Sequence, residues 1–395
     1  MLEEVFHELD CCITAPQGFT AGTAACGIKA DHIQDLAILA SDVPCVAAGT
    51  FTTSNARAAP VLLCQERLQS GKAQALIVNS GNANCATGQQ GMQNAYRMTE
   101  LVATHLGLDN TLILCSSTGI IGYQLPMEKL EVGVKQITLS KEGGKDFSEA
   151  IMTTDTYPKR LGLEFELDGR TIRLGGVAKG SRMIYPNMAT MLSYLTTDAA
   201  LECNWLQSEL RAAVADSFNM ISVDGDMSTN DTCILFANGL AGNVPLNASH
   251  PEVGRFQTAL RYITKFLAYE LARDGEDATK LMTVHIHSAY NKDDAVKAAR
   301  AVTHSSTWNH ALADDDPNWG RVVAALGASG CTFQQDQFDI FFGEVQVVKQ
   351  GIAAPYDQQE AQAAIAGHEV IITIDLHLGH SQATAYGSVL KAGCQ

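Results

Sequence analysis

The sequence predicts an α/β protein in which stacked β-sheets are covered by helices. Three observations support this class. Runs with the apolar or alternating pattern of strands recur along the chain, and segments with helical periodicity lie between them. The strand-like runs are too many for a regular β-α-β alternation, which disfavours a doubly wound sheet. The chain has 395 residues, 46% of them hydrophobic, and can therefore bury a large core in one big domain or two.

The elements of the first half follow from periodicity and from turn residues. Expected strands are 46–51, 75–79 and 112–115, with 58–61 as loop or edge sequence. Expected helices are 88–105, which follows a polar turn at 79–84, then 127–136 and 147–152. Asp168-Gly169 stands between β-rich runs and predicts a two-residue turn within a hairpin over 163–174.

The second half begins with a strand from Thr190, in which apolar and polar residues alternate as in a half-buried strand. Further strands are expected at 231–237, 282–287, 338–348 and 370–378. Helices are expected at 205–220, 252–272 and 293–302.

Composition excludes several classes of partner. The net charge is −16 without any basic run, which argues against nucleic acid and anionic membrane surfaces. No apolar run approaches the roughly 20 residues that span a bilayer. The acidic start lacks the positive region of a signal peptide. The chain has eleven cysteines, an odd number, and no C-x-x-C pair, which argues against a complete disulfide framework. We therefore expect a cytoplasmic protein with reduced thiols.

The stretch 179–192 has an unusual character. Gly180, Pro186 and Asn187 are turn and breaker residues, so the part before Ala189 is expected to be an irregular loop. Thr190 then stands where this loop enters a strand. A threonine hydroxyl needs a base to become a nucleophile, and a cut between Ala189 and Thr190 would supply one as the new α-amine. The alternative is a loop that enters an ordinary core strand.

The segments 179–181, 183–184, 186–192 and 195–199 closely resemble the self-cleaving signature of the ornithine acetyltransferases, the glutamate N-acetyltransferases of the cyclic arginine pathway. The resemblance implies that Thr190 is the acyl-carrying nucleophile and the first residue of a β chain 190–395, and that Ala189 ends an α chain 1–189. It also implies an α/β/β/α sandwich with a smaller second lobe. We place the main catalytic domain at 1–280 and the smaller lobe at 281–395.

Five further residues are candidates for the site. An acyl-transfer oxyanion needs donors, which a hydroxyl and a backbone N–H at Thr118-Gly119 would supply, although a plain turn after strand 112–115 would look the same. Lys179 would hold a substrate carboxylate or lower the pKa of a nearby amine, unless it is a solvated surface lysine. The resemblance makes Thr118 and Gly119 the oxyanion hole and places Thr153 and Lys179 in the substrate pocket. It also matches Glu276 to a glutamate that binds the incoming amine.

Other polar clusters are interpreted as scaffolding. The segments 224–232 and 316–321 match family sequence and brace the site with glycine turns. The acidic run 314–316 lacks a nearby ligand partner for a metal, and His377 and His380, in an expected strand, would face opposite sides. His285 and His287 would share one face, but no third ligand is visible. We therefore expect no metal site.

The resemblance is broken in three places. The family carries Ser-Pro-Leu-Val-Lys-Thr-Ala where this chain has Ser-Ser-Thr-Trp-Asn-His-Ala at 305–311. Leu390 and Gln395 fall where the family tail has an asparagine and a final hydroxyl residue, and Asp277 replaces a glycine. A lost polar contact would cost roughly 1–3 kcal/mol, so these changes affect the substrate more than the reaction type.

The leading hypothesis is a self-processing acetyltransferase with ping-pong kinetics. Thr190 would take an acetyl group from N-acetylornithine, or a similar N-acetyl amino acid, and pass it to glutamate, without cofactor or metal, in an α₂β₂ assembly. One alternative is a paralogue in specialised metabolism that acts on another ornithine- or arginine-like amine, or hydrolyses the acyl-enzyme. Another is a catalytically silent binding protein of the same fold.

Overall fold

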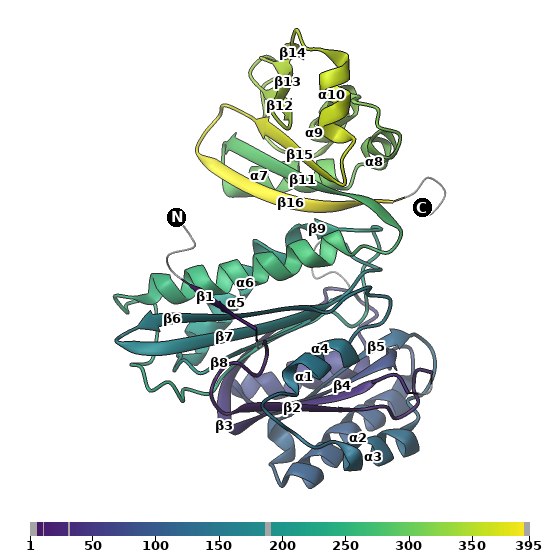
Figure 1. Cartoon of the computed structure of the whole chain (residues 1–395), viewed down its shortest axis with the longest axis vertical. Helices are drawn as coiled ribbons and strands as arrows, with labels where there is room; N and C mark the ends of the chain where they lie inside the picture. The colour runs from purple at the N-terminus through teal and green to yellow at the C-terminus, as the bar shows by residue number, and fades with distance from the viewer. Residues whose placement is uncertain (1–5, 11, 31, 186–190, 391–395) are drawn as a thin grey trace. The chain divides into compact units, whose positions relative to one another are not determined.

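The computed structural model describes residues 6–10, 12–30, 32–185 and 191–390, and these form two compact units. Of the described residues, the first unit comprises those within 6–180, 191–214 and 227–267, and the second comprises 181–185, 215–226 and 268–390. Each unit contains its own β-sheet (Figure 1). The lobe boundary at residue 280 stays a prediction.

The first unit is built on a nine-stranded sheet. Its strands lie in the order β1 (His7–Leu9), β6 (Lys159–Leu167), β7 (Arg170–Lys179), β8 (Leu192–Thr197), β10 (Thr232–Ala237), β3 (Leu36–Phe51), β4 (Lys72–Asn82) and β5 (Ile113–Ile120), and β2 (Phe19–Ala24) also pairs with β3. Two pairs are parallel, β8 with β10 and β4 with β5, and the other pairs are antiparallel.

The long strand β3 folds this sheet into two stacked layers. Residues 36–40 of β3 pair with β2 and β4, whereas residues 46–51 pair with β10. Leu39 and Leu76 from one layer share a core with Tyr194 and Ile234 from the other. Side chains alternate across a strand, so Ile38 faces the opposite way and belongs to a second core. The sheet therefore buries apolar residues on both of its faces.

Helices cover the outer faces of the two layers. The helices of this unit are α1 (Ala59–Arg67), α2 (Gly88–Leu106), α3 (Met127–Gln136), α4 (Gly144–Ala150), α5 (Cys203–Ala215) and α6 (Val253–Arg273) up to residue 267, with short 3-10 turns at Leu68–Ser70 and Asn110–Leu112. Met98 of α2 and Leu130 of α3 pack in the core on the outer side of β3 to β5. On the other layer, a Cβ at Gly176 of β7 would meet Ile263 of α6, so this helix packs directly on the strand. The predicted α/β/β/α arrangement is thereby confirmed (Figure 1).

The second unit contains a seven-stranded sheet. Its order is β14 (Ile352–Ala353), β13 (Val345–Lys349), β12 (Asp339–Phe342), β15 (Glu369–Asp375), β11 (Ala278–Ala289), β16 (Ser381–Leu390) and β9 (Ile221–Ser222). The helices are α7 (Lys292–Thr303), α8 (Ser306–Ala313), α9 (Trp319–Ala328) and α10 (Gln358–Ile365), with a 3-10 turn at Phe218–Met220 before β9. Alternate residues of β11 and β15, such as Val284 and Ile372, join these helices in one core that includes the fully buried Trp308.

Several predicted elements need correction. The segment 58–61 was expected to be loop or edge sequence, but α1 begins there with Pro60 in its first turn, where a missing N–H costs nothing. The expected strand 338–348 is a hairpin, because Gly343 adopts φ +54° between β12 and β13. Strand β8 is buried on both faces and not half-buried, since helices cover its layer. His377 and His380 lie between β15 and β16 and not within a strand.

Candidate active site

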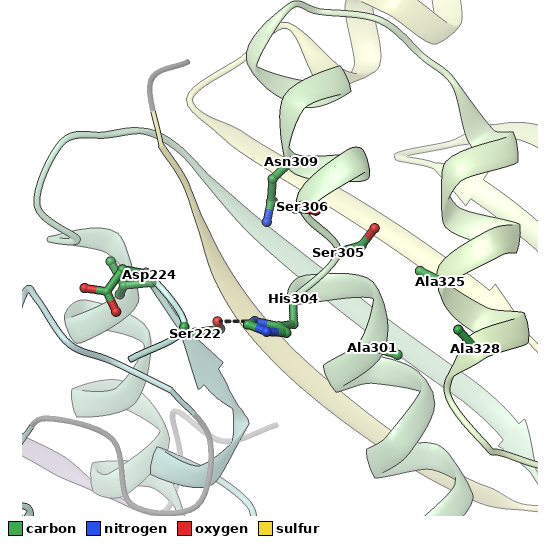
Figure 2. A pocket seen from close by; sticks show the side chains of 11 residues that line it. Ser222, Asp224, Ala301, His304, Ser305, Ser306, Asn309, Ala325 and Ala328 are labelled. Carbon is green, nitrogen blue, oxygen red and sulfur yellow. Dashed lines mark hydrogen bonds between the residues drawn. The ribbon is translucent and has the colours of Figure 1, made fainter. Parts of the chain in front are cut away.

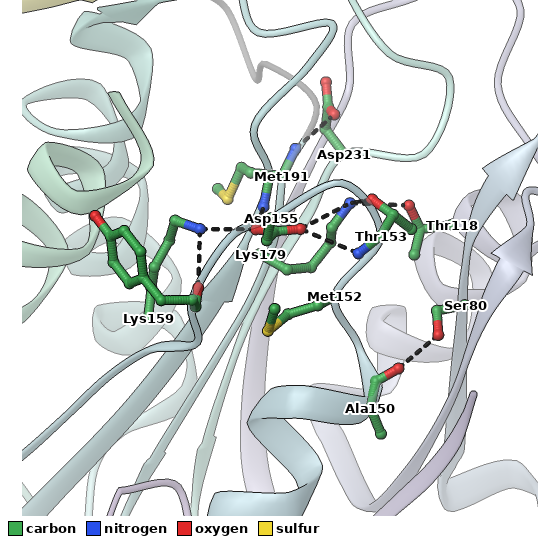
Figure 3. A network of polar contacts seen from close by, with 12 residues as sticks. Ser80, Thr118, Ala150, Met152, Thr153, Asp155, Lys159, Lys179, Met191 and Asp231 are labelled. Atoms are coloured by element: carbon green, nitrogen blue, oxygen red, sulfur yellow. Dashed lines mark hydrogen bonds and ion pairs between the residues drawn. The ribbon is translucent and has the colours of Figure 1, made fainter. Parts of the chain in front are cut away.

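Three of the predicted site residues meet in the first unit (Figure 3). Lys179 ends β7, Thr118 lies near the end of β5, and Thr153 follows α4. The Lys179 ammonium donates to the hydroxyl oxygens of Thr153, at 2.7 Å, and Thr118, at 3.2 Å. Strands β5 and β7 are far apart in the strand order, and it is the folding of the sheet into two layers that allows their ends to meet.

The segment that carries Thr118 is a strand and not the turn that the sequence suggested. Strand β5 continues to Ile120, and Gly119 lies opposite Gly81 of β4 with φ +133°. A Cβ at Gly119 would overlap the backbone of Gly81, so only glycine fits this position. Because the Thr118 oxygen accepts from Lys179, its own proton remains available for donation.

A buried carboxylate that sequence reasoning missed organises this cluster. Asp155 accepts hydrogen bonds from the Lys159 ammonium, at 2.8 Å, and from the backbone N–H groups of Gly180, at 2.6 Å, and Thr153, at 3.1 Å. Its second oxygen is 4.0 Å from the Lys179 ammonium. The side chains of Asp155 and Lys159 are fully buried. One carboxylate thus holds two buried lysines, and no local sequence pattern indicated it, because residues 155–159 are not helical.

The electrostatics of the cluster follow from burial and from the number of charges. Burial opposes the ionisation of Asp155, but the charges of Lys179 and Lys159 outweigh it and lower the pKa of this carboxyl to about 2. Burial and the like charge of Lys159 lower the pKa of Lys179, although Asp155 opposes this shift. The cluster therefore combines an ionised carboxylate with a lysine that releases its proton more readily than a free one.

The predicted nucleophile and cleavage point, Thr190 and Ala189, lie outside the described residues. The backbone N–H of Met191, the next residue, donates to Asp231 at 3.1 Å. Burial raises the pKa of Asp231 well above its usual range, against the opposing effects of the Met191 N–H, nearby hydroxyls and Lys179. The second Asp231 oxygen is buried without a hydrogen-bond partner among the described residues. Asp231 is thus a second carboxyl that sequence reasoning missed, because its motif was interpreted as scaffolding.

Glu276 lies in the second unit, between α6 and β11. Its N–H donates to the carbonyl of Ser181 at 2.7 Å, and one carboxylate oxygen is 3.6 Å from the Arg182 guanidinium. The other oxygen is buried without a partner among the described residues. Asp277 beside it adopts φ +62°, a conformation that favours glycine. This backbone conformation explains why the family pattern has a glycine at this position.

A cavity of about 530 Å³ in the second unit is lined by the segment that departs from the family pattern (Figure 2). Its walls include Ser222 of β9, Asp224 after this strand, His304 at the end of α7, and Asn309 of α8. The side-chain amide oxygen of Asn309 is buried without a partner among the described residues. Burial, aided by Arg300, lowers the pKa of His304. The cavity therefore combines neutral polar groups with one carboxylate, that of Asp224.

The wall of this cavity also holds the chain that leads towards residues 186–190. The Asp224 carboxylate accepts the N–H groups of Met183 and Ile184, the latter at 2.9 Å. The ring of Tyr185 packs on His304 with centroids 4.6 Å apart. Residues of the altered segment and of the loop before the predicted cleavage point thus share one surface of the second unit.

The candidate metal sites show ordinary hydrogen bonds. His285 contacts Thr384 at 3.0 Å and His377 contacts Asp339 at 3.1 Å. Among the described residues, no group of three or more His, Cys, Asp or Glu side chains is placed to hold a metal ion. The described cysteines are all free thiols. In the described part of the chain, every helix is too short or too polar to cross a bilayer.

Comparison with known proteins gives consistent results over nearly the whole chain. The model of the ArgJ family matches residues 20–393. The arginine biosynthesis bifunctional protein ArgJ of Symbiobacterium thermophilum is 47% identical over 379 residues, which cover 95% of this chain and 94% of that protein. The protein of the same name from Caldanaerobacter subterraneus is 43% identical over 389 residues, which cover 97% and 96%.

Two solved structures also match. The crystal structure of arginine biosynthesis bifunctional protein ArgJ from Bacillus halodurans is 39% identical, with a TM-score of 0.45, and the match covers 47% of this chain and 98% of that one. Ornithine acetyltransferase from Mycobacterium tuberculosis, solved in complex with ornithine, is 36% identical, with a TM-score of 0.43, and the match covers 47% and 100%.

Proposed function

The chain belongs to the ArgJ family, and from this premise we propose that it is an N-acetyltransferase of arginine biosynthesis. The acetyl donor is N-acetylornithine or a similar N-acetyl amino acid, and the acceptor is glutamate. The observation that carries the proposal is the buried cluster in which Lys179 joins the hydroxyls of Thr118 and Thr153. Family membership supplies the reaction class, and the cluster supplies side chains suited to it.

The first half-reaction transfers the acetyl group to Thr190. Water hydrolyses the peptide bond between Ala189 and Thr190 to give a carboxylate on Ala189 and a free α-amine on Thr190. This α-amine takes the proton of the Thr190 hydroxyl as its oxygen attacks the acetyl carbonyl. The tetrahedral oxyanion accepts hydrogen bonds from the Thr118 hydroxyl and the Gly119 N–H. On collapse, the bond to the ornithine nitrogen breaks, and this amine leaves with the proton that the α-amine held.

The second half-reaction reverses the first with another amine. The unprotonated amine of glutamate attacks the acetyl-threonine and N-acetylglutamate forms. The proton that this amine loses passes through the α-amine to the Thr190 oxygen. The Glu276 carboxylate binds the incoming amine, for which its unpartnered, buried oxygen is suited. The Lys179 ammonium, held by Asp155, attracts the substrate carboxylate.

Two buried carboxyl groups, Asp155 and Asp231, position and charge-balance the residues that take part in these steps. Asp155 balances the charge of two lysines, so Lys179 can remain protonated in a buried position. Asp231 fixes the N–H of Met191, the residue directly after the proposed nucleophile. We further propose an α₂β₂ assembly in the cytoplasm and a division into a main domain, 1–280, and a smaller lobe, 281–395.

The test combines processing with turnover. Denaturing mass spectrometry of purified protein is expected to show two fragments that meet at Ala189 and Thr190, and the Thr190→Ala variant is expected to stay intact. The processed protein, incubated with N-acetylornithine and glutamate, is expected to form N-acetylglutamate. An intact wild-type chain without turnover would favour the binding protein of the same fold.

A second candidate is supported by the cavity beside α8. The altered segment 305–311 lines it, and the Asn309 oxygen there has no partner among the described residues. A paralogue that acts on a different ornithine- or arginine-like amine, or that hydrolyses its acyl-enzyme, would keep the cleavage and change the acceptor. Complete cleavage and acetyl-enzyme formation without N-acetylglutamate would identify this case, and a screen of amine acceptors would then name the product.

A further inference from the structure

Lys29 lies between β2 and β3, in a loop that one buried carboxylate shapes. Asp35 accepts the backbone N–H groups of Cys26, at 2.7 Å, Ile28, at 2.6 Å, and Lys29 itself, at 3.0 Å. Asp35 is fully buried, so these bonds are shielded from water. The backbone that carries Lys29 is therefore held in place independently of the contacts of the Lys29 side chain.

The Lys29 ammonium makes contacts that suit its charged form. Its nitrogen lies 2.6 Å from the carbonyl oxygen of Met152, 3.4 Å from that of Ala150 and 3.3 Å from that of Gln34. An ammonium has three N–H donors and no acceptor, so three carbonyls satisfy it completely. The Ala150 and Met152 carbonyls belong to the C-terminal end of α4 and the turn after it, where the helix dipole also favours a cation.

The turn that Lys29 holds leads directly to the candidate site. Thr153 follows Met152, its N–H donates to Asp155, and its hydroxyl accepts from Lys179 at 2.7 Å (Figure 3). We propose that Lys29 is a positioning residue for acetyl transfer, which sets the turn from which Thr153 meets Lys179. The inference rests on the proposed function of that site, and it assigns Lys29 no contact with substrate.

The protonation of Lys29 links this role to pH. Burial lowers the pKa of Lys29 to about 8; Lys179 adds to the decrease, while the charges of Asp35 and Asp155 oppose it. A neutral amine keeps two donors and turns a lone pair towards a carbonyl, so the hydrogen bonds from Lys29 to the turn weaken as the pH rises through about 8. Substrate binding is then expected to weaken over the same range.

Two variants and one matched control test the proposal. Lys29→Met removes the ammonium and Lys29→Arg keeps a charge that is not lost below pH 12. Lys129→Met is the control, because Lys129 donates to the carbonyl of Gly27 in the same loop and makes no hydrogen bond to the turn among the described residues. Hydrogen exchange of the segment 151–156 reports the turn directly, and KM and kcat per acetylated site report its effect on the reaction.

At pH 7 we expect Lys29→Met to speed exchange in 151–156 and to raise KM about tenfold with kcat per site within about threefold, with Lys129→Met unchanged. We expect the wild-type KM to rise above pH 8, and that of Lys29→Arg to stay level to pH 9. Unchanged exchange and KM in Lys29→Met, or an equal rise of KM with pH in Lys29→Arg, would overturn the proposal. If the wild type transfers no acetyl group, the proposed function fails, and the exchange measurement still decides whether Lys29 holds the turn.

Discussion

Replacing Asp155 by asparagine tests the central electrostatic feature of the site. The pKa of this carboxyl is lowered from 3.8 to about 2, so its charge stabilises the fold by roughly 2 kcal/mol at neutral pH. The amide of asparagine would also turn an N–H group towards donors that now meet an oxygen, which adds about 1–3 kcal/mol. We therefore expect Asp155→Asn to lower the free energy of unfolding by about 3–5 kcal/mol, the range typical of a broken buried ion pair.

The assay is urea unfolding at several pH values. Because the folded pKa lies below the unfolded one, the stabilisation by Asp155 is fully present above 3.8 and is lost as the pH falls through about 2. The difference in stability between wild type and Asp155→Asn should therefore shrink as the pH falls from 5 towards 2. Glu164→Gln is a matched control, because its half-exposed pair with Arg173 at 2.8 Å is expected to contribute less than about 1 kcal/mol.

Lys159 provides a second check on the same reasoning. Asp155→Asn leaves Lys159 and Lys179 buried without their carboxylate, so removing one of these charges should recover part of the loss. The double variant with Lys159→Met is expected to be more stable than Asp155→Asn alone. A loss below about 1 kcal/mol in Asp155→Asn, or strictly additive effects in the double variant, would refute the idea that one carboxylate holds both lysines.

Three further predictions concern single residues. Thr118→Val should lower kcat by about 10²- to 10³-fold while Thr118→Ser stays within a few-fold, because valine removes one of the two oxyanion donors and serine keeps it; equal rates would exclude this role. Gly119→Ala should cost at least about 2 kcal/mol in urea unfolding through overlap with Gly81, and Gly254→Ala, which has open space, should be neutral or stabilising; equal effects would contradict the packing argument. Asn309→Ala should change the free energy of unfolding by less than about 1 kcal/mol, because it loses one hydrogen bond of 3.3 Å from the side-chain amide to the Thr303 carbonyl and also removes an unpartnered side-chain oxygen. A larger loss would show that this oxygen has a partner.

Long periodic segments could be predicted from the sequence because burial imposes their pattern. The helix expected at 88–105 is observed at Gly88–Leu106, and the one expected at 252–272 at Val253–Arg273. Asp168-Gly169 correctly indicated the β6–β7 hairpin, with both residues at positive φ. In contrast, the first part of β3, residues 36–45, was missed, because residues 36–41 are buried on both faces and show no alternation.

The site was predicted where a residue type has a characteristic chemistry. Thr118, Thr153 and Lys179 were proposed from motif resemblance, and the structure brings them into contact. Asp155 and Lys29 were missed because their importance depends on which distant backbone groups they meet. Such contacts arise from the folding of the sheet into two layers, and local periodicity does not report them.

The most direct test of the account is the location of the acetyl group during turnover. Wild-type protein is incubated with N-acetylornithine carrying a ¹³C-labelled acetyl group, quenched in acid and analysed by peptide mass spectrometry. We predict a labelled acetyl group on the peptide that begins with Thr190, and its removal when glutamate is added before the quench. Sustained formation of N-acetylglutamate without label on Thr190, or with label on another residue, would contradict the proposed mechanism.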